Sequence, residues 1–251
     1  MEIESAGLSG AALEKYVYND YKFEKEADMS IKLFISAMIK FLFGAAIVGA
    51  LIFLPAWSMG FAQGWMLMAA LFIPMFIVGI IMMIKSPDLL KKRLDAKESQ
   101  KDQKIVLFLS GIMFIAAFIV AGLNYRFSWF VLPLWASIIG LVIFLSAYIL
   151  YGEVLRENAY LSRTIEVQEN QKVIDTGLYG VVRHPMYMAT LILFFAMPII
   201  LGSLFSLAIM LMYIPLIVIR IRNEEKVLEE GLEGYKEYKR KVKYRLIPFI
   251  W

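Results

Sequence analysis

Long runs of apolar residues, separated by short polar segments, set the pattern of this chain. A helix rises about 1.5 Å per residue, so about 20 apolar residues cross a hydrocarbon core of roughly 30 Å. Four runs are long enough, and they cover Leu33 to Leu54, Trp65 to Ile84, Ile105 to Leu123 and Phe130 to Tyr151. We predict one transmembrane helix in each of these runs.

A fifth run, from Tyr187 to Ile219, is too long for one crossing, since it would form a helix of about 50 Å. The pair Gly202-Ser203 lies at its centre, and such a pair is typical of a turn. The pattern therefore predicts a hairpin of two short helices, which brings the count to about six transmembrane helices. The expected fold is an all-α polytopic integral membrane protein with a C-terminal helical hairpin.

Composition supports this class and excludes several kinds of site. The 251 residues are 60% hydrophobic and 19% charged, with a mean hydropathy of +0.66, whereas soluble domains are about half apolar and about a quarter charged. There is no Cys and only one His, so thiol chemistry and Cys-rich or His-rich metal sites are excluded. Glu2 and Glu4, with no apolar run before residue 31, argue against a cleavable secretory signal.

The distribution of Lys and Arg predicts the orientation of the helices. The segment up to Lys32 holds 4, the 85–104 loop 7, the 152–187 loop 4 and the tail from Arg220 9, which makes 24 of the 26 basic residues. Six spans place all four segments on one side, while Arg126 alone falls in the opposite loops and Lys40 falls inside the first span. The positive-inside rule then puts both termini in the cytoplasm.

The chain divides into three expected parts, namely an N-terminal interfacial segment (residues 1–30), helices one to four with an amphipathic loop at 85–104 (residues 31–157) and a C-terminal region (residues 158–251). The loop opens with Ser86-Pro87-Asp88, a typical helix start, and we expect a short helix on the anionic membrane surface. For Lys40, snorkelling to the interface is favoured over a functional role.

Polar residues converge at the cytoplasmic ends of the last three predicted spans. Pro185 suits the first position of a helix, so His184 should lie at its N-terminus, where free N–H groups and Arg183 favour an anionic group. Arg220 and Glu224 are four residues apart at the end of the hairpin, and hence on one helical face. We predict one pocket at the cytoplasmic face that combines these groups with nearby tyrosines.

Each of these residues also has a simpler interpretation. Arg183 could be a positive-inside anchor, Arg220 and Glu224 a surface ion pair, and His184 a helix cap. Tyr179 and Tyr187 would by default belong to the aromatic belt of the membrane interface. In the tail, Tyr235, Tyr238 and the run Lys239-Arg240-Lys241 suggest a solvated helix that touches lipid headgroups.

In combination, the residues resemble the isoprenylcysteine carboxyl methyltransferase family, which shares its C-terminal pattern with phospholipid methyltransferases. The resemblance covers residues 158–251, and the earlier spans are similar to bacterial members in general layout, which implies a prokaryotic plasma membrane. Its motifs are Gly177-Leu-Tyr179, Arg183-His184-Pro185-x-Tyr187, the apolar hairpin, Arg220-x-x-x-Glu224-Glu225, Tyr235-x-x-Tyr238 and Ile247-Pro248.

The resemblance implies S-adenosylmethionine as cofactor and a lipophilic methyl acceptor that enters from the bilayer, with membrane lipids as the other partners and no nucleic acid or metal. It assigns catalytic roles to Arg220, which would face the acceptor, and to Glu224, which would also contact the cofactor. Eukaryotic members often carry a His in place of Gln171. The remaining cofactor residues would be Gln171, Lys172, Val173, Ile174, Tyr179, Arg183, His184, Pro185, Met186 and Tyr187.

Two other functions compete with methyl transfer. An NADPH-dependent membrane reductase of the sterol type has a similar Arg-His-Pro segment, which such enzymes typically follow with Asn-Tyr and then a Gly-Glu pair. In this chain Met186-Tyr187 is followed by Met188-Ala189-Thr190, with no acid, which counts against reduction. A non-catalytic lipid-binding membrane protein is the third possibility. The pattern does not distinguish a carboxylate, an amine or a thiol as the methyl acceptor, and it leaves the oligomeric state open.

Overall fold

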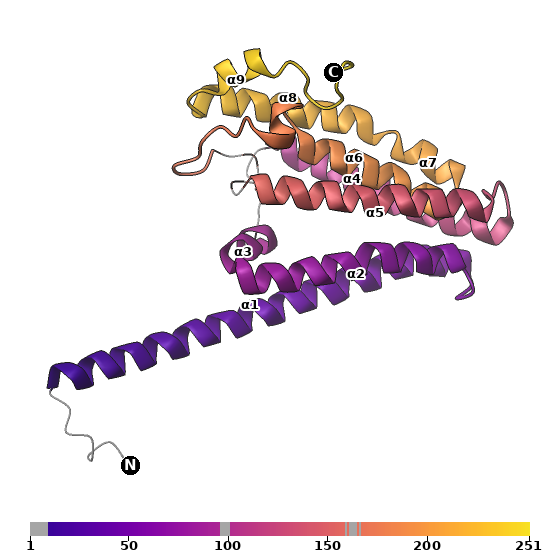
Figure 1. The fold of residues 1–251 in the computed structure, drawn as a ribbon. Coiled ribbons are helices and arrows are strands. Elements are labelled where there is room, and N and C mark those ends of the chain that lie inside the picture. The colour runs from indigo at the N-terminus through magenta and orange to yellow at the C-terminus, as the bar shows by residue number, and fades with distance from the viewer. Residues whose placement is uncertain (1–9, 96–100, 159, 161–164, 166) are drawn as a thin grey trace.

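The structure is a computed structural model, and it describes residues 10–95, 101–158, 160, 165 and 167–251. These residues form helices joined by loops, as predicted, and Figure 1 shows them packed as an elongated bundle. The elements are α1 (Gly10–Ala56), α2 (Ala62–Lys85), α3 (Pro87–Asp95), α4 (Lys101–Phe127), α5 (Leu134–Glu157), the 3-10 helix η1 (Gly177–Gly180), α6 (Pro185–Ile200), α7 (Leu204–Met210), α8 (Tyr213–Gly231) and α9 (Tyr235–Lys241).

Five stretches of helix are long and apolar enough to cross a membrane, so the protein is an integral membrane protein. They are Ile31–Ala56, Ala62–Lys85, Gln103–Phe127, Leu134–Glu157 and Leu204–Gly231, while Pro185–Ile200 is a shorter apolar helix. A full crossing by this sixth helix, and with it the six-span count, stays a prediction. Large apolar side chains such as Phe43, Ile84 and Ile149 are exposed on the outer faces, where lipid would cover them.

The predicted start of the fourth span at residue 130 is wrong. Asn124 holds the preceding loop through two hydrogen bonds to the backbone of Phe130, at 3.0 and 3.1 Å. The helix begins only after Pro133 and continues to Glu157, beyond the predicted end. Local hydrogen bonding therefore overrides the hydrophobicity of residues 130–133.

The C-terminal hairpin turns at Gly202, as predicted. This glycine has φ +68°, a left-handed conformation that only glycine adopts readily, and the Ser203 hydroxyl accepts a hydrogen bond from the Ser206 N–H and so begins α7. The second arm is interrupted between α7 and α8. Pro215 explains this break, because it has no N–H for the carbonyl of Leu211 and its ring clashes with that carbonyl.

Close helix pairs hold the bundle together. Helix α5 packs along α6 at Gly140, where an added Cβ would lie 3.0 Å from the backbone nitrogen of Ile200. Helix α1 packs on α4 at Gly122, where a Cβ would lie 2.5 Å from the carbonyl oxygen of Ile52. Small residues allow such approaches between membrane helices. The large fully buried side chains of this core include Ile52, Phe61, Leu67, Phe144, Ile200 and Ile217.

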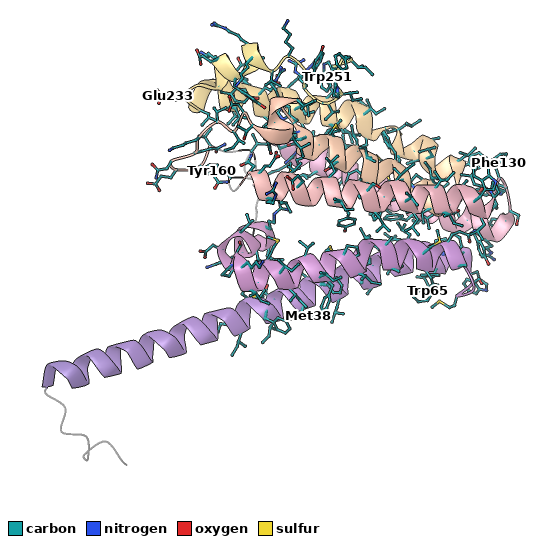
Figure 2. The ribbon with its side chains drawn as sticks, viewed as in Figure 1. Met38, Trp65, Phe130, Tyr160, Glu233 and Trp251 are labelled. Carbon is teal, nitrogen blue, oxygen red and sulfur yellow. The ribbon has the colours of Figure 1, made fainter. Side chains whose placement is uncertain are left out.

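The two ends of the bundle differ in character. Helix α3, the loop after α5 and helix α9 lie toward one end in Figure 1, so the segments rich in Lys and Arg gather there. In Figure 2, Tyr160 and Glu233 mark this basic end, and Trp65 and Phe130 mark the opposite one. The arrangement agrees with the charge distribution, and the cytoplasmic placement of the termini stays a prediction.

The expected surface segments take two forms. Helix α3 begins at Pro87, with Asp88 in its first turn, as predicted. Lys40 donates a hydrogen bond to the carbonyl oxygen of Leu94, near the end of α3, at 2.8 Å. Residues 10–30 continue directly into the first span as part of α1, while residues 1–9 and 96–100 lie outside the described part of the chain. The interfacial position of residues 1–30 stays a prediction.

Candidate functional site

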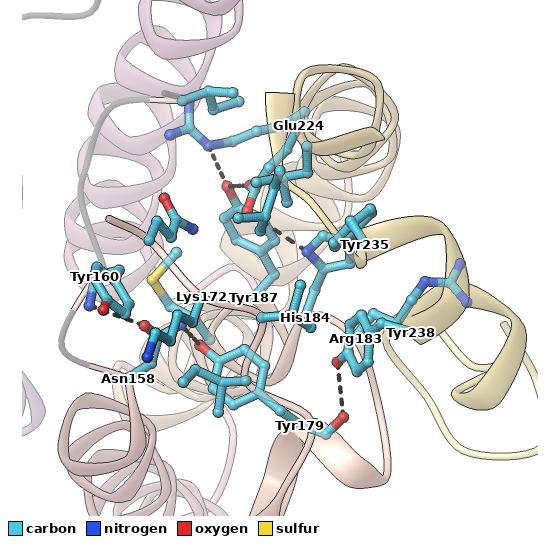
Figure 3. Close-up of a pocket in the computed structure, with 18 residues that line it drawn as sticks. Asn158, Tyr160, Lys172, Tyr179, Arg183, His184, Tyr187, Glu224, Tyr235 and Tyr238 are labelled. Carbon is cyan, nitrogen blue, oxygen red and sulfur yellow. Dashed lines mark hydrogen bonds and ion pairs between the residues drawn. The ribbon is translucent and has the colours of Figure 1, made fainter. Parts of the chain in front are cut away.

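A cavity lies at the basic end of the bundle, between the loop after α5, the start of α6, helix α8 and helix α9 (Figure 3). It encloses about 100 Å³, which is less than the roughly 300 Å³ of small ligand pockets. A ligand of cofactor size therefore needs side chains in its wall to move. The sequence-predicted residues in the wall are Gln171, Lys172, Val173, Ile174, Tyr179, Arg183, His184, Met186, Tyr187, Arg220 and Glu224.

His184 is the N-cap of α6, and Pro185 is the first residue of that helix, as predicted from the His-Pro pair. Pro185 therefore shapes the site through the backbone and is not in the cavity wall. The C-terminal tail holds this turn, since the backbone N–H groups of Arg183 and His184 donate to the carbonyl oxygens of Tyr244 and Arg245, at 2.9 and 2.8 Å.

Tyr187 joins the two arms of the hairpin at the level of His184. Its hydroxyl accepts a hydrogen bond from Nε of Arg220 at 3.0 Å and donates one to Oε2 of Glu224. Nδ1 of His184 lies 3.8 Å from Oε1 of Glu224, and the imidazole stacks on the Tyr187 ring. The hairpin thus brings together the four side chains that the sequence predicted to meet (Figure 3).

Glu225 organises a second group of charges behind the cavity, and sequence reasoning missed its role. Its carboxylate is 3% exposed and accepts hydrogen bonds from Nε of Arg183 at 2.8 Å and from Nε of Arg245 at 2.9 Å. Arg183 also donates to the carbonyl oxygens of Val242 and Lys243. The guanidinium of Arg183 therefore binds Glu225 and the tail, while Arg183 also lines the cavity.

The loop before α6 forms the wall opposite α8. At Gly177, φ is +54° and an added Cβ would clash with the Glu157 carboxylate, which accepts the N–H of Leu178 at 2.9 Å. Glycine is thus required where α5 anchors this loop. Tyr179 follows, and its hydroxyl accepts a hydrogen bond from the Asn158 amide at 3.0 Å. Burial raises the pKa of Tyr179, so its phenol stays neutral at physiological pH.

An exposed ion pair anchors the loop before α6 at Asp175. Lys241 lies 2.6 Å from a carboxylate oxygen of Asp175, and this contact lowers the pKa of Asp175. The carboxylate is therefore ionised at neutral pH. The pair connects the loop before α6 to helix α9.

The expectation that Tyr235 and Tyr238 lie on a solvated helix is wrong. Both side chains are buried, at 4% and 5% exposure, and both line the cavity. Tyr238 donates a hydrogen bond to the carbonyl oxygen of Tyr179 at 2.7 Å, whereas the buried hydroxyl of Tyr235 has no hydrogen-bond partner among the described residues. Burial raises the pKa of both phenols. Their spacing with Val242 was a usable signal, because all three face one side of a helix.

Gln103, on α4, is a further residue that the motifs did not indicate. Its side chain is fully buried and accepts a hydrogen bond from Nη1 of Arg220. Among the described residues, no group of three or more His, Asp or Glu side chains could hold a metal ion. The site therefore offers carboxylates, guanidinium groups, one imidazole and several phenols as its chemistry.

Most residues of this site lie in a part of the chain that is similar to known proteins. Residues 135–233 match the model of the phospholipid methyltransferase family, which confirms the resemblance of the C-terminal region to this class. A 91-residue stretch is 32% identical to the Delta(14)-sterol reductase of Mus musculus, and it spans 35% of this chain and 22% of that protein. The solved structure of a eukaryotic intramembrane Ras methyltransferase, isoprenylcysteine carboxyl methyltransferase, aligns over 86% of each chain with a TM-score of 0.45 and 20% sequence identity.

Proposed function

We propose that this integral membrane protein transfers a methyl group from S-adenosylmethionine to a lipophilic acceptor. The observation that carries the proposal is the cavity at the end of the hairpin, in which Glu224, His184 and Tyr187 meet within the region that matches phospholipid methyltransferases. Catalytic roles for Arg220 and Glu224 are part of this proposal.

The residues of the cavity fit the charges of S-adenosylmethionine. Its ammonium group suits the carboxylate of Glu224, and its carboxylate suits the His184 imidazole at the N-terminus of α6. Aromatic faces can accommodate a sulfonium, and five tyrosines line the space. The unpartnered hydroxyl of Tyr235 offers a further hydrogen bond that no described residue uses.

When bound, this cofactor supplies an electrophilic methyl group. Methyl transfer is an in-line displacement, so the protein contributes mainly by holding the acceptor near that methyl and by excluding water. The Arg220 guanidinium is suited to orient an acceptor carboxylate, for which no base is needed. An amine acceptor would need a proton acceptor, and Glu224, which lines the cavity, would serve as that base.

Reduction is the second candidate function, because part of the chain is similar to a sterol reductase. Two features weigh against it. Reductases of this type typically carry a Gly-Glu pair soon after their His-Pro, whereas residues 186–190 of this chain contain no acid. In that segment, the hydroxyl of Thr190 donates to the carbonyl oxygen of Met186 within α6. The carboxylate in the cavity comes instead from Glu224, on the second arm of the hairpin.

Thermal-shift titration of the detergent-purified protein tests these functions directly. A ligand that binds only the native state raises the apparent stability by mass action. We expect S-adenosylhomocysteine to raise the melting temperature and NADPH to leave it unchanged. Stabilisation by NADPH alone would favour the reductase function over methyl transfer. No stabilisation by either ligand would favour the non-catalytic lipid-binding function.

A further inference from the structure

Gln103 connects the N-terminal half of the chain to the proposed catalytic arginine. It lies near the start of α4, outside the region that matches the family model, and its side chain is 0% exposed. Its Oε1 accepts a hydrogen bond from Nη1 of Arg220 at 3.0 Å. A polar side chain is therefore buried beside the guanidinium that would face the acceptor.

The chemistry of this contact fixes the orientation of the Gln103 amide. A guanidinium only donates hydrogen bonds, so the oxygen of the amide must face Arg220 and the NH₂ group must face elsewhere. That nitrogen is buried and has no hydrogen-bond partner among the described residues. Buried donors in proteins are nearly always paired, and an unmade ligand contact is one reason for an exception.

Arg220 is held between two helices. Its Nε donates to the hydroxyl of Tyr187, on α6, and its Nη1 donates to Gln103, on α4. Tyr187 and Arg220 line the proposed cofactor cavity, whereas Gln103 is not in its wall. Gln103 therefore contacts Arg220 from outside that cavity.

We propose that Gln103 belongs to the acceptor-binding site, where its Nε2 donates a hydrogen bond to an oxygen atom of the methyl acceptor. Its Oε1 holds the Arg220 guanidinium at the same time. Glutamine suits this position because one planar group accepts from an arginine and donates to a ligand. The inference rests on the proposed methyltransferase function and assigns that function a residue of α4.

Two substitutions separate the roles of the two amide atoms. Gln103→Glu keeps an oxygen for Arg220 and removes the N–H donor, whereas Gln103→Met keeps the volume and removes both. Ser110→Ala is the matched control, because Ser110 is also buried on α4 and its hydroxyl only donates to the carbonyl oxygen of Val106.

The assay uses the detergent-purified full chain with tritiated S-adenosylmethionine. N-acetyl-S-farnesylcysteine and a total membrane lipid extract are the acceptors, each over a concentration series. We expect both Gln103 variants to raise the half-saturating acceptor concentration by about tenfold or more, the loss expected for one hydrogen bond to a ligand. The shift in melting temperature produced by S-adenosylhomocysteine should stay at the wild-type value.

The melting temperature of each Gln103 variant without ligand supplies a second test, which needs no methyl acceptor. Because Nε2 has no hydrogen-bond partner among the described residues, its removal in Gln103→Glu should leave the melting temperature at or above that of wild type. Gln103→Met also takes an acceptor from the buried Nη1 of Arg220, so its melting temperature should be lower. A lower melting temperature in Gln103→Glu, or wild-type acceptor dependence in that variant, would overturn the inference alone. A wild-type protein that binds no S-adenosylhomocysteine and labels neither acceptor would overturn the proposed function and this inference together.

Discussion

At the scale of single residues, the hydroxyl of Tyr187 is the contact on which Arg220 and Glu224 converge. Tyr187→Phe keeps the ring that stacks on His184 but removes this contact. We expect methyl transfer to fall by roughly ten- to a hundredfold, because the Arg220 guanidinium loses the Tyr187 hydroxyl, the hydrogen-bond partner that orients it. Initial rates with labelled S-adenosylmethionine measure the effect.

Tyr148→Phe is the control for that substitution, because the Tyr148 hydroxyl donates to the Leu71 carbonyl oxygen, between α5 and α2 and away from the cavity. It should retain wild-type rates. Equal rates in Tyr187→Phe and wild type would show that the hydroxyl does not support catalysis.

Substitutions of Arg220 and of Glu224 should have different effects on turnover and on cofactor binding. Arg220→Ala removes the group that would orient the acceptor, so methyl transfer should be lost while S-adenosylhomocysteine still binds. Glu224→Ala removes the carboxylate that would pair with the cofactor, so the dissociation constant should rise by about tenfold or more. Isothermal titration with S-adenosylhomocysteine, beside rate measurements, distinguishes them. Weaker cofactor binding in Arg220→Ala alone would reverse the two assignments.

The candidate site was partly readable from the sequence because its main signals are local. The His184-Pro185 pair defines a helix start, and the four-residue spacing of Arg220 and Glu224 defines a shared face. Contacts across long separations were readable only where the predicted hairpin implied them. Gln103 touches Arg220 across 117 positions, and nothing in its neighbourhood distinguishes it from other polar residues at the end of an apolar run.

At the scale of elements, Glu225 fastens the C-terminal tail to the start of α6. Its buried carboxylate lies against Arg183, His184 and Arg245, and lies 3.7 Å from Lys239. Glu225→Gln would leave the buried Arg183 without this charge, and removal of one partner from a buried pair costs about 3–5 kcal/mol. We expect a lower melting temperature and faster proteolysis of residues 232–251.

Glu229→Gln is the control for the tail. Glu229 is on the same helix and pairs with Lys239, but its side chain is 32% exposed, so the loss should be small. Tail cleavage at the wild-type rate in Glu225→Gln would contradict the fastening role of Glu225.

Helices α5 and α6 should tolerate no added methyl group at their contact. In Gly140→Ala the new Cβ would lie 2.9 Å from the Ile199 side chain and 3.0 Å from the Ile200 nitrogen, so the backbone must shift. Such overpacking costs about 1–3 kcal/mol. Gly152→Ala, on the same helix, meets nothing within 4 Å and should be neutral or stabilising. Thermal unfolding in one detergent compares them, and equal melting temperatures would contradict the close contact.

The sequence predicted the existence of these helices better than their ends. The lengths of the apolar runs identified the first three spans. The Gly202-Ser203 pair identified the hairpin turn, and both signals follow from local composition. The late start of α5 and the break before α8 depend on Asn124 and Pro215, whose effects act through the backbone. Helix α9 was misjudged because its polar residues concealed a buried face made by Tyr235 and Tyr238.

At the scale of the whole molecule, aromatic side chains and charge distinguish the two ends. At the end opposite the cavity, the guanidinium of Arg126 lies over the rings of Trp57 and Phe127, at 5.5 and 5.2 Å from their centroids. Trp129 stacks on Phe127 in the same loop. Such rings are typical of a membrane interface. The single basic residue of this end is thus held at the interface, which fits the positive-inside distribution of the others.

Because the chain has no Cys, single engineered cysteines can test the six-span topology without background labelling. At the end opposite the cavity, exposed positions are Met59 in the loop between α1 and α2, Ser128 in the loop between α4 and α5, and Leu204 at the start of α7. At the basic end, Glu169 is exposed in the loop after α5, and Lys236 is exposed in α9. With six spans, a membrane-impermeant maleimide should label the first three in intact cells and the last two only after permeabilisation. If the short helix α6 does not cross the bilayer, the Glu169→Cys and Leu204→Cys variants will react from the same side. That result would reject six spans.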